Sequence, residues 1–271
     1  MSDVLLLSRH LVALGAMTLL AAAPAGAQRA GAMTAVWDKS LPSGSSVDIH
    51  NIDGDVTVVA SSSGKVEVLG AKYGRDTADV YADVHETRDG VVICVMRHHS
   101  RGTCDEDGFN SHNRHGDWNG NDESASMNLE VRVPAGMRVS AGSVSGNVRV
   151  SGAEGDLRAH SVSGNVHLDA ARATSFAASS VSGDIDARIG SLSGTGRLSA
   201  KSVSGDITLD LPKEFAADVT MHTVSGELQS DFPMTLQGRQ NRRGLEGRIG
   251  NGGRELQLST VSGNVRLRSV K

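Results

Sequence analysis

The chain has 271 residues, a formal net charge of −4 and 32 glycines, and only 3% of its residues are aromatic. This charge balance excludes the strongly basic surface that nucleic-acid-binding proteins present to their ligands. Because aromatic side chains are scarce, the core must consist of thin layers of Val, Leu, Ile and Ala. The length permits one or two domains.

Residues 1–27 have the pattern of a secretory signal peptide. A basic pair at positions 9 and 10 precedes an apolar run over 11–23, and small residues at 25–27 allow cleavage after Ala27. The apolar run is shorter than the roughly 20 residues of a membrane-spanning helix, which argues against the alternative, an N-terminal anchor. No later segment could span a membrane. We therefore expect an exported chain in the periplasm, on the cell surface or secreted.

Downstream of a linker expected at 28–44, the chain divides into 45–138, a first repeat with a long insertion, and 139–271, the other repeats. The insertion holds four apolar segments typical of strands, namely Val66–Val68, Val80–Val84, Val91–Met96 and Met127–Val133. Asp89-Gly90 is a hairpin signal, and Pro134 ends the last strand. We expect a small antiparallel region that caps the N-terminal end of the repeats.

A polar loop over 98–124 lies beside the two cysteines of the chain. In an exported protein Cys94 and Cys104 predict a disulfide in preference to a metal pair or free thiols, and so short a loop implies about 2–3 kcal/mol of stabilisation. The loop offers possible ligands for a divalent metal, although their spacing matches no zinc signature. These residues are His98, His99, His112, His115, Asp105 and Asp107. The alternative is a solvated loop without a ligand, and no cofactor is predicted.

The dominant feature of the chain is a twelve-residue pattern that occurs seven times around a glycine. The glycines are Gly54, Gly146, Gly164, Gly183, Gly205, Gly226 and Gly263. With the glycine as position zero, small or apolar residues occupy −7, −5, −2, +2 and +4, and Ser230 is the one exception. Spacings of two predict strands, whereas the spacing of three before −2 predicts a corner. We expect these five positions to face inward, with the glycine also inward at a kink.

Each repeat thus predicts a strand, a corner and a second strand, which bury their apolar side chains only when repeats stack. Each buried Val, Ile or Leu contributes about 1.5–3 kcal/mol. The expected fold is all-β, a parallel β-solenoid with the antiparallel region inserted near its N-terminus. Extra residues always fall between +4 and the next −7. We therefore expect the insertions 59–138 and 231–255 at one ragged edge, opposite a smooth edge of corners.

The 231–255 insertion carries arginines that could hold phosphate or carboxylate groups of an envelope polymer. They are Arg239, Arg242, Arg243, Arg248 and Arg254. The alternative is a solvated hairpin tip. No catalytic residue is marked, because the chain has no GxSxG motif and no concentrated carboxylate cluster. We predict a protein that is not an enzyme, with a carbohydrate-active β-helix lyase or hydrolase as the alternative.

The repeated Ser/Thr-Val-Ser-Gly-Asp/Asn unit behind an export signal resembles a bacterial exported β-strand-repeat family of unknown function, often labelled "putative adhesin". The resemblance covers residues 45–271 and includes V-R-V-P-A-G at 131–136. It also includes the closing G-N-G-G-R-E-L-Q-L-S-T-V-S-G-N-V-R-L at 250–267. It implies a repetitive β fold, and no ligand-binding residues come with it.

The residues and the resemblance together favour an exported, non-enzymatic scaffold or adhesin-like binding protein. The expected partner is an envelope component, a protein or a polysaccharide, which binds at the ragged edge. A periplasmic protein that binds a divalent metal is a further hypothesis.

Overall fold

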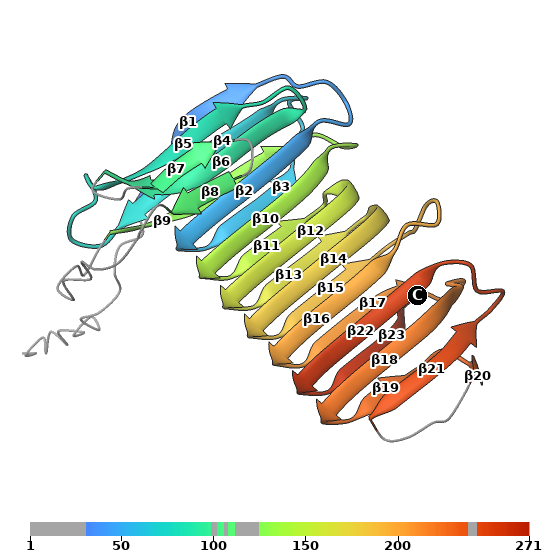
Figure 1. The fold of residues 1–271 in the computed structure, drawn as a ribbon. Coiled ribbons are helices and arrows are strands. Elements are labelled where there is room, and N and C mark those ends of the chain that lie inside the picture. The colour runs from blue at the N-terminus through green and yellow to red at the C-terminus, as the bar shows by residue number, and fades with distance from the viewer. Residues whose placement is uncertain (1–30, 99–101, 106–107, 112–124, 238–242, 271) are drawn as a thin grey trace, which may run out of the picture.

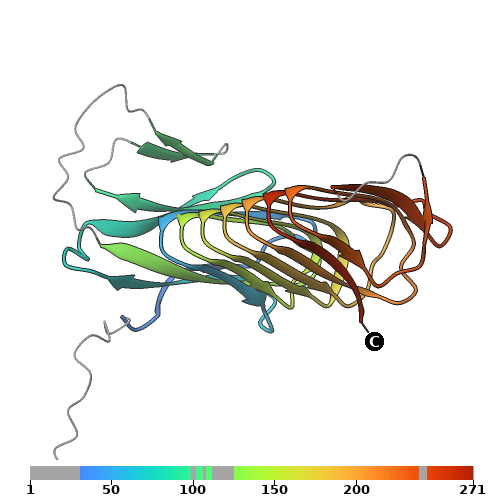
Figure 2. The same cartoon turned by 90° about the horizontal axis from the view of Figure 1, so that it is seen from below.

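The structure is a computed structural model that describes residues 31–98, 102–105, 108–111, 125–237 and 243–270. The predicted signal peptide lies outside these residues. Throughout the described part the chain is all-β and has no helix, so none there is available to cross a membrane. Two large, mostly parallel sheets face each other as layers of an elongated molecule (Figures 1 and 2).

Each sheet runs the length of the molecule. Sheet A contains, in spatial order, β1 (Thr34–Lys39), β4 (Val66–Tyr73), β9 (Ser126–Val133), β3 (Val56–Ala60), β11 (Val148–Ser151), β13 (Val166–Ala170), β15 (Ile185–Ile189), β17 (Ile207–Pro212), β23 (Val265–Val270) and β19 (Leu228–Ser230). Sheet B contains β20 (Met234–Leu236), β21 (Gly244–Ile249), β18 (Ala217–Ser225), β22 (Glu255–Ser262), β16 (Leu198–Ser204), β14 (Arg172–Ser182), β12 (Glu154–Ser163), β10 (Arg138–Ser145), β2 (Ser46–Asp53), β6 (Gly90–Arg97) and β5 (Val80–Glu86). A separate hairpin consists of β7 (Gly102–Asp105) and β8 (Gly108–Ser111).

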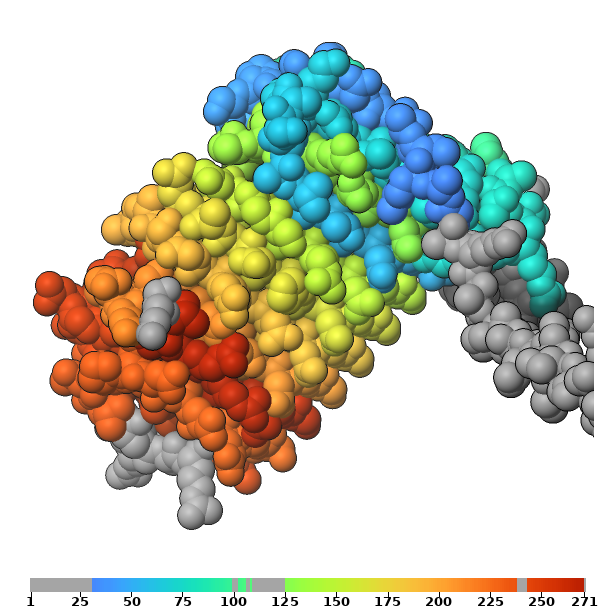
Figure 3. Space-filling model, turned by 180° about the vertical axis from the view of Figure 1, so that it is seen from behind, coloured from blue at the N-terminus to red at the C-terminus, as the bar shows by residue number. Residues whose placement is uncertain are grey.

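Every glycine-centred repeat forms one layer of the stack, with a strand in sheet B, a tight corner and a strand in sheet A. The layers are β2–β3, β10–β11, β12–β13, β14–β15, β16–β17, β22–β23 and β18–β19. Equivalent residues pair in parallel register from layer to layer, as Leu157 does with Val139 and Phe176. Seen from behind, the layers in the middle of the molecule follow one another from green through yellow to orange along its long axis (Figure 3).

The last layer in the sequence is not the last layer in space. Strand β22 pairs with both β16 and β18, and β23 pairs with both β17 and β19. The final repeat therefore lies between the two repeats that precede it (Figure 1). The hairpin β20–β21 runs antiparallel to β18 and covers the end of sheet B.

The insertion extends both sheets at the N-terminal end. Its four predicted strands are present as β4, β5, β6 and β9. Only β4 and β5 are antiparallel to their neighbours in the sheets, whereas β6 lies parallel to β2 and β9 lies parallel to β3. Strands β6 and β9 thus form a further parallel layer. The segment predicted as a linker also differs, because its residues 34–39 form β1 on the outer side of β4.

The core lies between the sheets and consists of the residues at −7, −5, +2 and +4, as the repeat predicts. In the layer of Gly164 these are Leu157, Ala159, Val166 and Leu168, all of which are buried. Position −2 does not face inward, so that part of the prediction is wrong: Val162 is 41% exposed, whereas Ser161 at −3 is buried. The strand alternation continues one step further, to −3, and the corner occupies −2 to +1.

Candidate binding surfaces

The corner edge is held together by a row of hydroxyl groups and glycines. The Ser161 hydroxyl donates a hydrogen bond of 2.8 Å to the carbonyl oxygen of Gly146 in the neighbouring layer. The same bond is made at position −3 by Ser143, Ser180, Ser202, Thr223 and Thr260. A Cβ atom on Gly164 would lie 2.2 Å from that carbonyl oxygen of Gly146, so only glycine allows the layers to approach. The glycine thus faces the adjacent layer.

The acid or amide at +1 also joins one layer to the next. The Asn165 Oδ1 atom accepts a hydrogen bond from the backbone N–H of Asp184 at 2.9 Å. Equivalent bonds continue along the edge, with acceptors Asn128, Asp55, Asn147, Asp184, Asp206 and Asn264. The N–H of Asn264, followed by the Arg266 guanidinium, lowers the pKa of Asp206. These carboxylates hold the fold, as turn-forming Asx side chains do.

Between these two rows runs a line of exposed valines, here called the valine ladder. It consists of Val144, Val162, Val181, Val203, Val261 and Val224, in spatial order. Each is 41–46% exposed, which is unusual for a large apolar side chain in this molecule. Hydropathy does not distinguish these valines from core residues. Each valine lies two positions before its glycine, and a core residue lies two positions after the same glycine.

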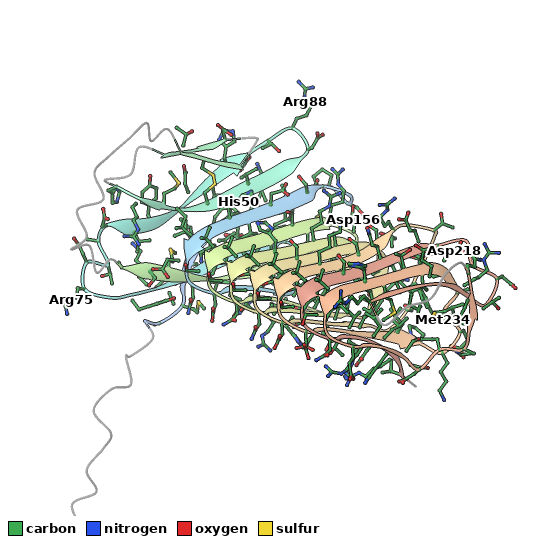
Figure 4. The ribbon with its side chains drawn as sticks, turned by 60° about the horizontal axis from the view of Figure 1, so that its bottom comes forward. His50, Arg75, Arg88, Asp156, Asp218 and Met234 are labelled. Carbon is green, nitrogen blue, oxygen red and sulfur yellow. A yellow bond between two sulfur atoms is a disulfide. The ribbon has the colours of Figure 1, made fainter. Side chains whose placement is uncertain are left out.

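The opposite edge is ragged, as the position of the insertions predicts, and it contains two hollows, of which the first has a mainly polar lining. One hollow, of about 320 Å³, lies over the start of β2, β10 and β12 and under the β5–β6 turn. Its charged lining consists of Asp48, Asp89, Asp156, Arg138 and Arg158. Arg88, Asp156 and Asp218 lie along this side of the molecule (Figure 4).

Asp156 in the first hollow already contacts one residue beside the hollow and one within it. Asp156 accepts a hydrogen bond of 2.7 Å from the Ser175 hydroxyl, and its carboxylate lies 3.9 Å from the Arg158 guanidinium. The second hollow, of about 360 Å³, lies further along the same edge, where Arg172 forms an ion pair with Glu154 at 2.5 Å. The two hollows offer carboxylates and guanidinium groups in sequence along one edge.

Comparison with known proteins decides the family. Residues 41–268 match the family described as Toastrack DUF4097. The chain belongs to this family. The resemblance found in the repeats is therefore confirmed. No curated protein matches the chain at a significant level.

Two solved structures are similar to this Toastrack chain. One is titled a putative cell adhesion protein from Clostridium sporogenes, with 8% identity and a TM-score of 0.47, and covers 88% of this chain and 100% of its own. The other is titled a putative adhesin from Bacteroides fragilis, with 14% identity and a TM-score of 0.40, and covers 90% of this chain and 100% of its own.

The arginines of the 231–255 insertion do not form one cluster in the described part of the Toastrack chain. Arg254 is 6% exposed and donates hydrogen bonds to the carbonyl oxygens of residues 174, 193, 194 and 196, so it ties loops of the ragged edge together. Arg248 forms an ion pair with Asp218 at 2.7 Å. Arg243 precedes β21, and Arg239 and Arg242 lie outside the described residues.

The predicted disulfide between Cys94 and Cys104 is present, with a Cα–Cα distance of 5.9 Å. It attaches the β7–β8 hairpin to the outer face of sheet B at β6 (Figure 2). A Cβ atom on Gly108 of β8 would lie 2.8 Å from the His50 Nε2 atom. Burial lowers the pKa of His50, while Asp48 raises it and His160 adds to the lowering.

The loop 98–124 differs from its expected position. Strands β6 and β9 form a layer of their own, so the end of β6 and the start of β9 both lie at the corner edge. The two points at which the loop is attached are therefore at that edge. The loop therefore does not share an edge with the 231–255 insertion. Of the proposed metal ligands, His98 stacks on Tyr81 at 4.5 Å and Asp105 ends β7.

The other proposed ligands, His99, His112, His115 and Asp107, lie outside the described residues. Among the residues that the structure does describe, no three His, Cys, Asp or Glu side chains come together as a metal site would require.

A charged cluster that sequence reasoning missed lies on the outer face of sheet A. The Asp210 side chain is 4% exposed and binds Arg268 at 2.6 Å and Arg188 at 3.3 Å, which come from the strands on either side. The bond to Asp210 raises the pKa of Arg268. This carboxylate is paired with both arginines within the sheet, so removal of the arginines would leave a buried charge without a partner.

Proposed function

We propose that the chain is an exported, non-enzymatic β-solenoid that binds an envelope polysaccharide through its ragged edge, in the manner of an adhesin. The observation that supports this function best is the polar hollow between Arg138, Arg158, Asp48, Asp89 and Asp156. Its volume of about 320 Å³ lies at the lower end of the range for small-ligand sites, which suits one sugar unit.

The chemistry of the hollow favours a ligand rich in hydroxyl and carboxylate groups. Carboxylates accept hydrogen bonds from sugar hydroxyls, and guanidinium groups bind carboxylates in a planar, two-bond geometry. The second hollow, between Glu154 and Arg172, lies on the same edge. A polymer that fills the first hollow could therefore continue along the edge into the second, which favours a polysaccharide over a single small molecule.

Catalysis has little support in the same residues. A glycoside hydrolase needs a general acid, a carboxyl whose pKa is raised by its surroundings. The carboxyls with displaced pKa values in the described residues, Asp206 and Asp218, have lowered pKa values because each accepts hydrogen bonds from an arginine and a backbone N–H. Neither lines the hollow.

Binding of the exported chain to polysaccharide extracted from the envelope of the source bacterium tests this function. Replacing Arg138 and Arg158 by Ala should weaken binding at least tenfold, because each charge-assisted contact contributes about 1.5–3 kcal/mol. The matched control replaces two exposed cations elsewhere, Arg149 and Lys213, and should bind normally. Equal losses in both variants, or depolymerisation of the ligand, would refute the proposal. A mature N-terminus at Gln28 would support export.

A further inference from the structure

The valine ladder is more regular than any structural requirement explains. Its six side chains lie on six adjacent strands, spaced about 4.8 Å apart, so the ladder is about 24 Å long. The neighbouring positions −3, 0 and +1 each join one layer to the next, whereas the valines are exposed. The row of corners that carries them runs along one edge of the stack (Figure 1). A threonine would suit an exposed β position equally well.

No repeat places a polar residue in the ladder, although the nearby outward position −4 varies freely. Position −4 holds Gly142, His160, Ser179, Lys201, Ser259 and His222. Selection for β propensity alone would allow Thr or Tyr at −2 in some repeats. A continuous apolar line on an otherwise polar edge is instead typical of a surface that contacts a partner.

The rows on either side of the ladder differ in charge. On the side of sheet B, position −4 holds a lysine in one layer, Lys201, and a histidine in two, His160 and His222. On the side of sheet A, position +1 is acidic in three layers, at Asp184, Asp206 and Glu227. In the layer of His160 the +1 residue is a neutral amide. Lys201 therefore has an acidic counterpart, Asp206, in its own layer on the opposite side of the valines, and Glu227 lies opposite His222 in the same way.

We propose that the valine ladder binds the valine ladder of a second copy of this chain, around a two-fold axis parallel to the stack. This axis places each layer against the same layer of the other copy and exchanges the two sides. Lys201 then faces Asp206 of the second copy, and His222 faces its Glu227. A reversed arrangement would bring acidic rows together, which opposes association. A second copy also has the same 4.8 Å repeat, so every rung meets a rung, as in stacked β assemblies.

The area of the ladder sets the strength of this contact. Six valines at 41–46% exposure offer on the order of 400 Å² per copy, about half of the 800 Å² that a stable interface buries on each partner. The flanking Ser, Asp and Lys rows supply a polar rim. The dimer is accordingly weak and concentration-dependent, and it gains strength where many copies face one another at a surface.

Sedimentation equilibrium of the exported chain, from micromolar to millimolar concentration, tests the interface. The wild type should show a monomer–dimer equilibrium, and Val162→Asp with Val203→Asp should remain monomeric at concentrations at least 100-fold higher. The control, Thr174→Asp with Thr220→Asp, adds the same charge at exposed strand positions away from the ladder and should dimerise normally. Matching circular dichroism spectra show that both variants fold. A monomeric wild type, or a ladder variant that dimerises, would overturn the proposal.

Cysteine crosslinking tests the orientation. With the two native cysteines paired, a Val203→Cys variant presents one reactive thiol. In the proposed arrangement Val203 faces Val203 of the second copy, so this variant alone should form disulfide-linked dimers under mild oxidation. The reversed arrangement pairs Val203 with Val181 instead. Crosslinks that appear only when Val181→Cys and Val203→Cys chains are mixed would therefore refute the proposed axis.

Discussion

Opposite substitutions at two neighbouring corner residues test which side chain faces the core. Thr260 is 2% exposed, and its hydroxyl donates a 3.0 Å hydrogen bond to the carbonyl oxygen of Gly205. Val261, the next residue, is 46% exposed. Thr260→Val and Val261→Thr each exchange a methyl group and a hydroxyl at nearly constant volume, so they differ only in position.

The structure gives very different free-energy changes for the two substitutions. Removal of the Thr260 hydroxyl leaves the part-buried carbonyl oxygen of Gly205 without its donor, which costs about 1–3 kcal/mol. Val261→Thr places a hydroxyl in water, and such surface changes stay within about 0.5 kcal/mol. In a chain of this size 1 kcal/mol shifts the melting temperature by about 2–4 °C. A loss near 2 kcal/mol in Thr260→Val therefore lowers it by about 4–8 °C, and Val261→Thr lowers it by less than about 2 °C.

Thermal unfolding followed by circular dichroism measures both shifts, and urea unfolding at an unchanged m-value checks the free energies. The pair Thr223 and Val224 in the terminal layer repeats the comparison with the same chemistry. If Val261→Thr proves as destabilising as Thr260→Val, the valine faces inward after all and the account of the corner fails. A neutral Thr260→Val would refute the role of the hydroxyl.

Three further predictions concern single residues. Gly164→Ala should lower the free energy of unfolding in urea by about 2–3 kcal/mol, because its Cβ would lie 2.2 Å from the carbonyl oxygen of Gly146 in the neighbouring layer. At Gly44 a Cβ would meet no other atom, so Gly44→Ala should cost only about 1–2 kcal/mol, because of the positive φ. Because the pKa of Asp206 is lowered in the folded chain, its carboxylate contributes stability that is fully present above about pH 3.9 and is lost as the pH falls through the folded-state pKa. The melting temperature of Asp206→Asn should therefore fall less steeply with decreasing pH than that of the wild type. Parallel melting curves would contradict this. The lowered pKa of His50 means that the unfolded chain protonates first below about pH 6.5, so His50→Gln should lose less stability between pH 7 and 5, as melting temperatures would show.

Much of the fold follows from the spacing of apolar residues. Alternation at −7, −5, +2 and +4 requires two short strands per repeat, and the fixed length of each repeat requires that equivalent residues pair in register. The strands of the insertion could be predicted for the same reason, because Val91–Met96 and Met127–Val133 are apolar runs bounded by turn residues. Their parallel pairing with β2 and β3 could not, since it joins segments far apart in the chain.

The prediction that position −2 faces inward is wrong because hydropathy does not record hydrogen bonds between layers. Ser161 is polar, yet it is buried because its hydroxyl reaches the carbonyl oxygen of Gly146. Val162 is apolar, yet it is exposed. The sequence contained a signal for this arrangement, since Ser or Thr occupies −3 in every repeat after the first. A small hydroxyl residue that recurs beside a glycine indicates a satisfied buried donor.

The spatial order of the layers could have been predicted from the exceptions in the repeat. Two departures, Glu227 at +1 and Ser230 at +4, occur in the same repeat, and that repeat forms the end of the stack. A terminal layer has no successor whose N–H needs an acceptor, so a glutamate is tolerated at +1. At +4 the Ser230 hydroxyl accepts a hydrogen bond from the N–H of Phe232, whose ring packs in the core at this end of the stack. The negative charge and the three-residue β19 also discourage pairing at the open edge of sheet A.

The final repeat, around Gly263, obeys every rule because it lies inside the stack. Its Asn264 accepts the N–H of Glu227 and donates its own N–H to Asp206, so both neighbouring layers are joined through it. Strand β23 is consequently paired on both sides, with β17 and with β19. The inserted position of this repeat therefore joins its two neighbouring layers, and loss of residues 255–270 would separate the terminal layer from the rest of the stack.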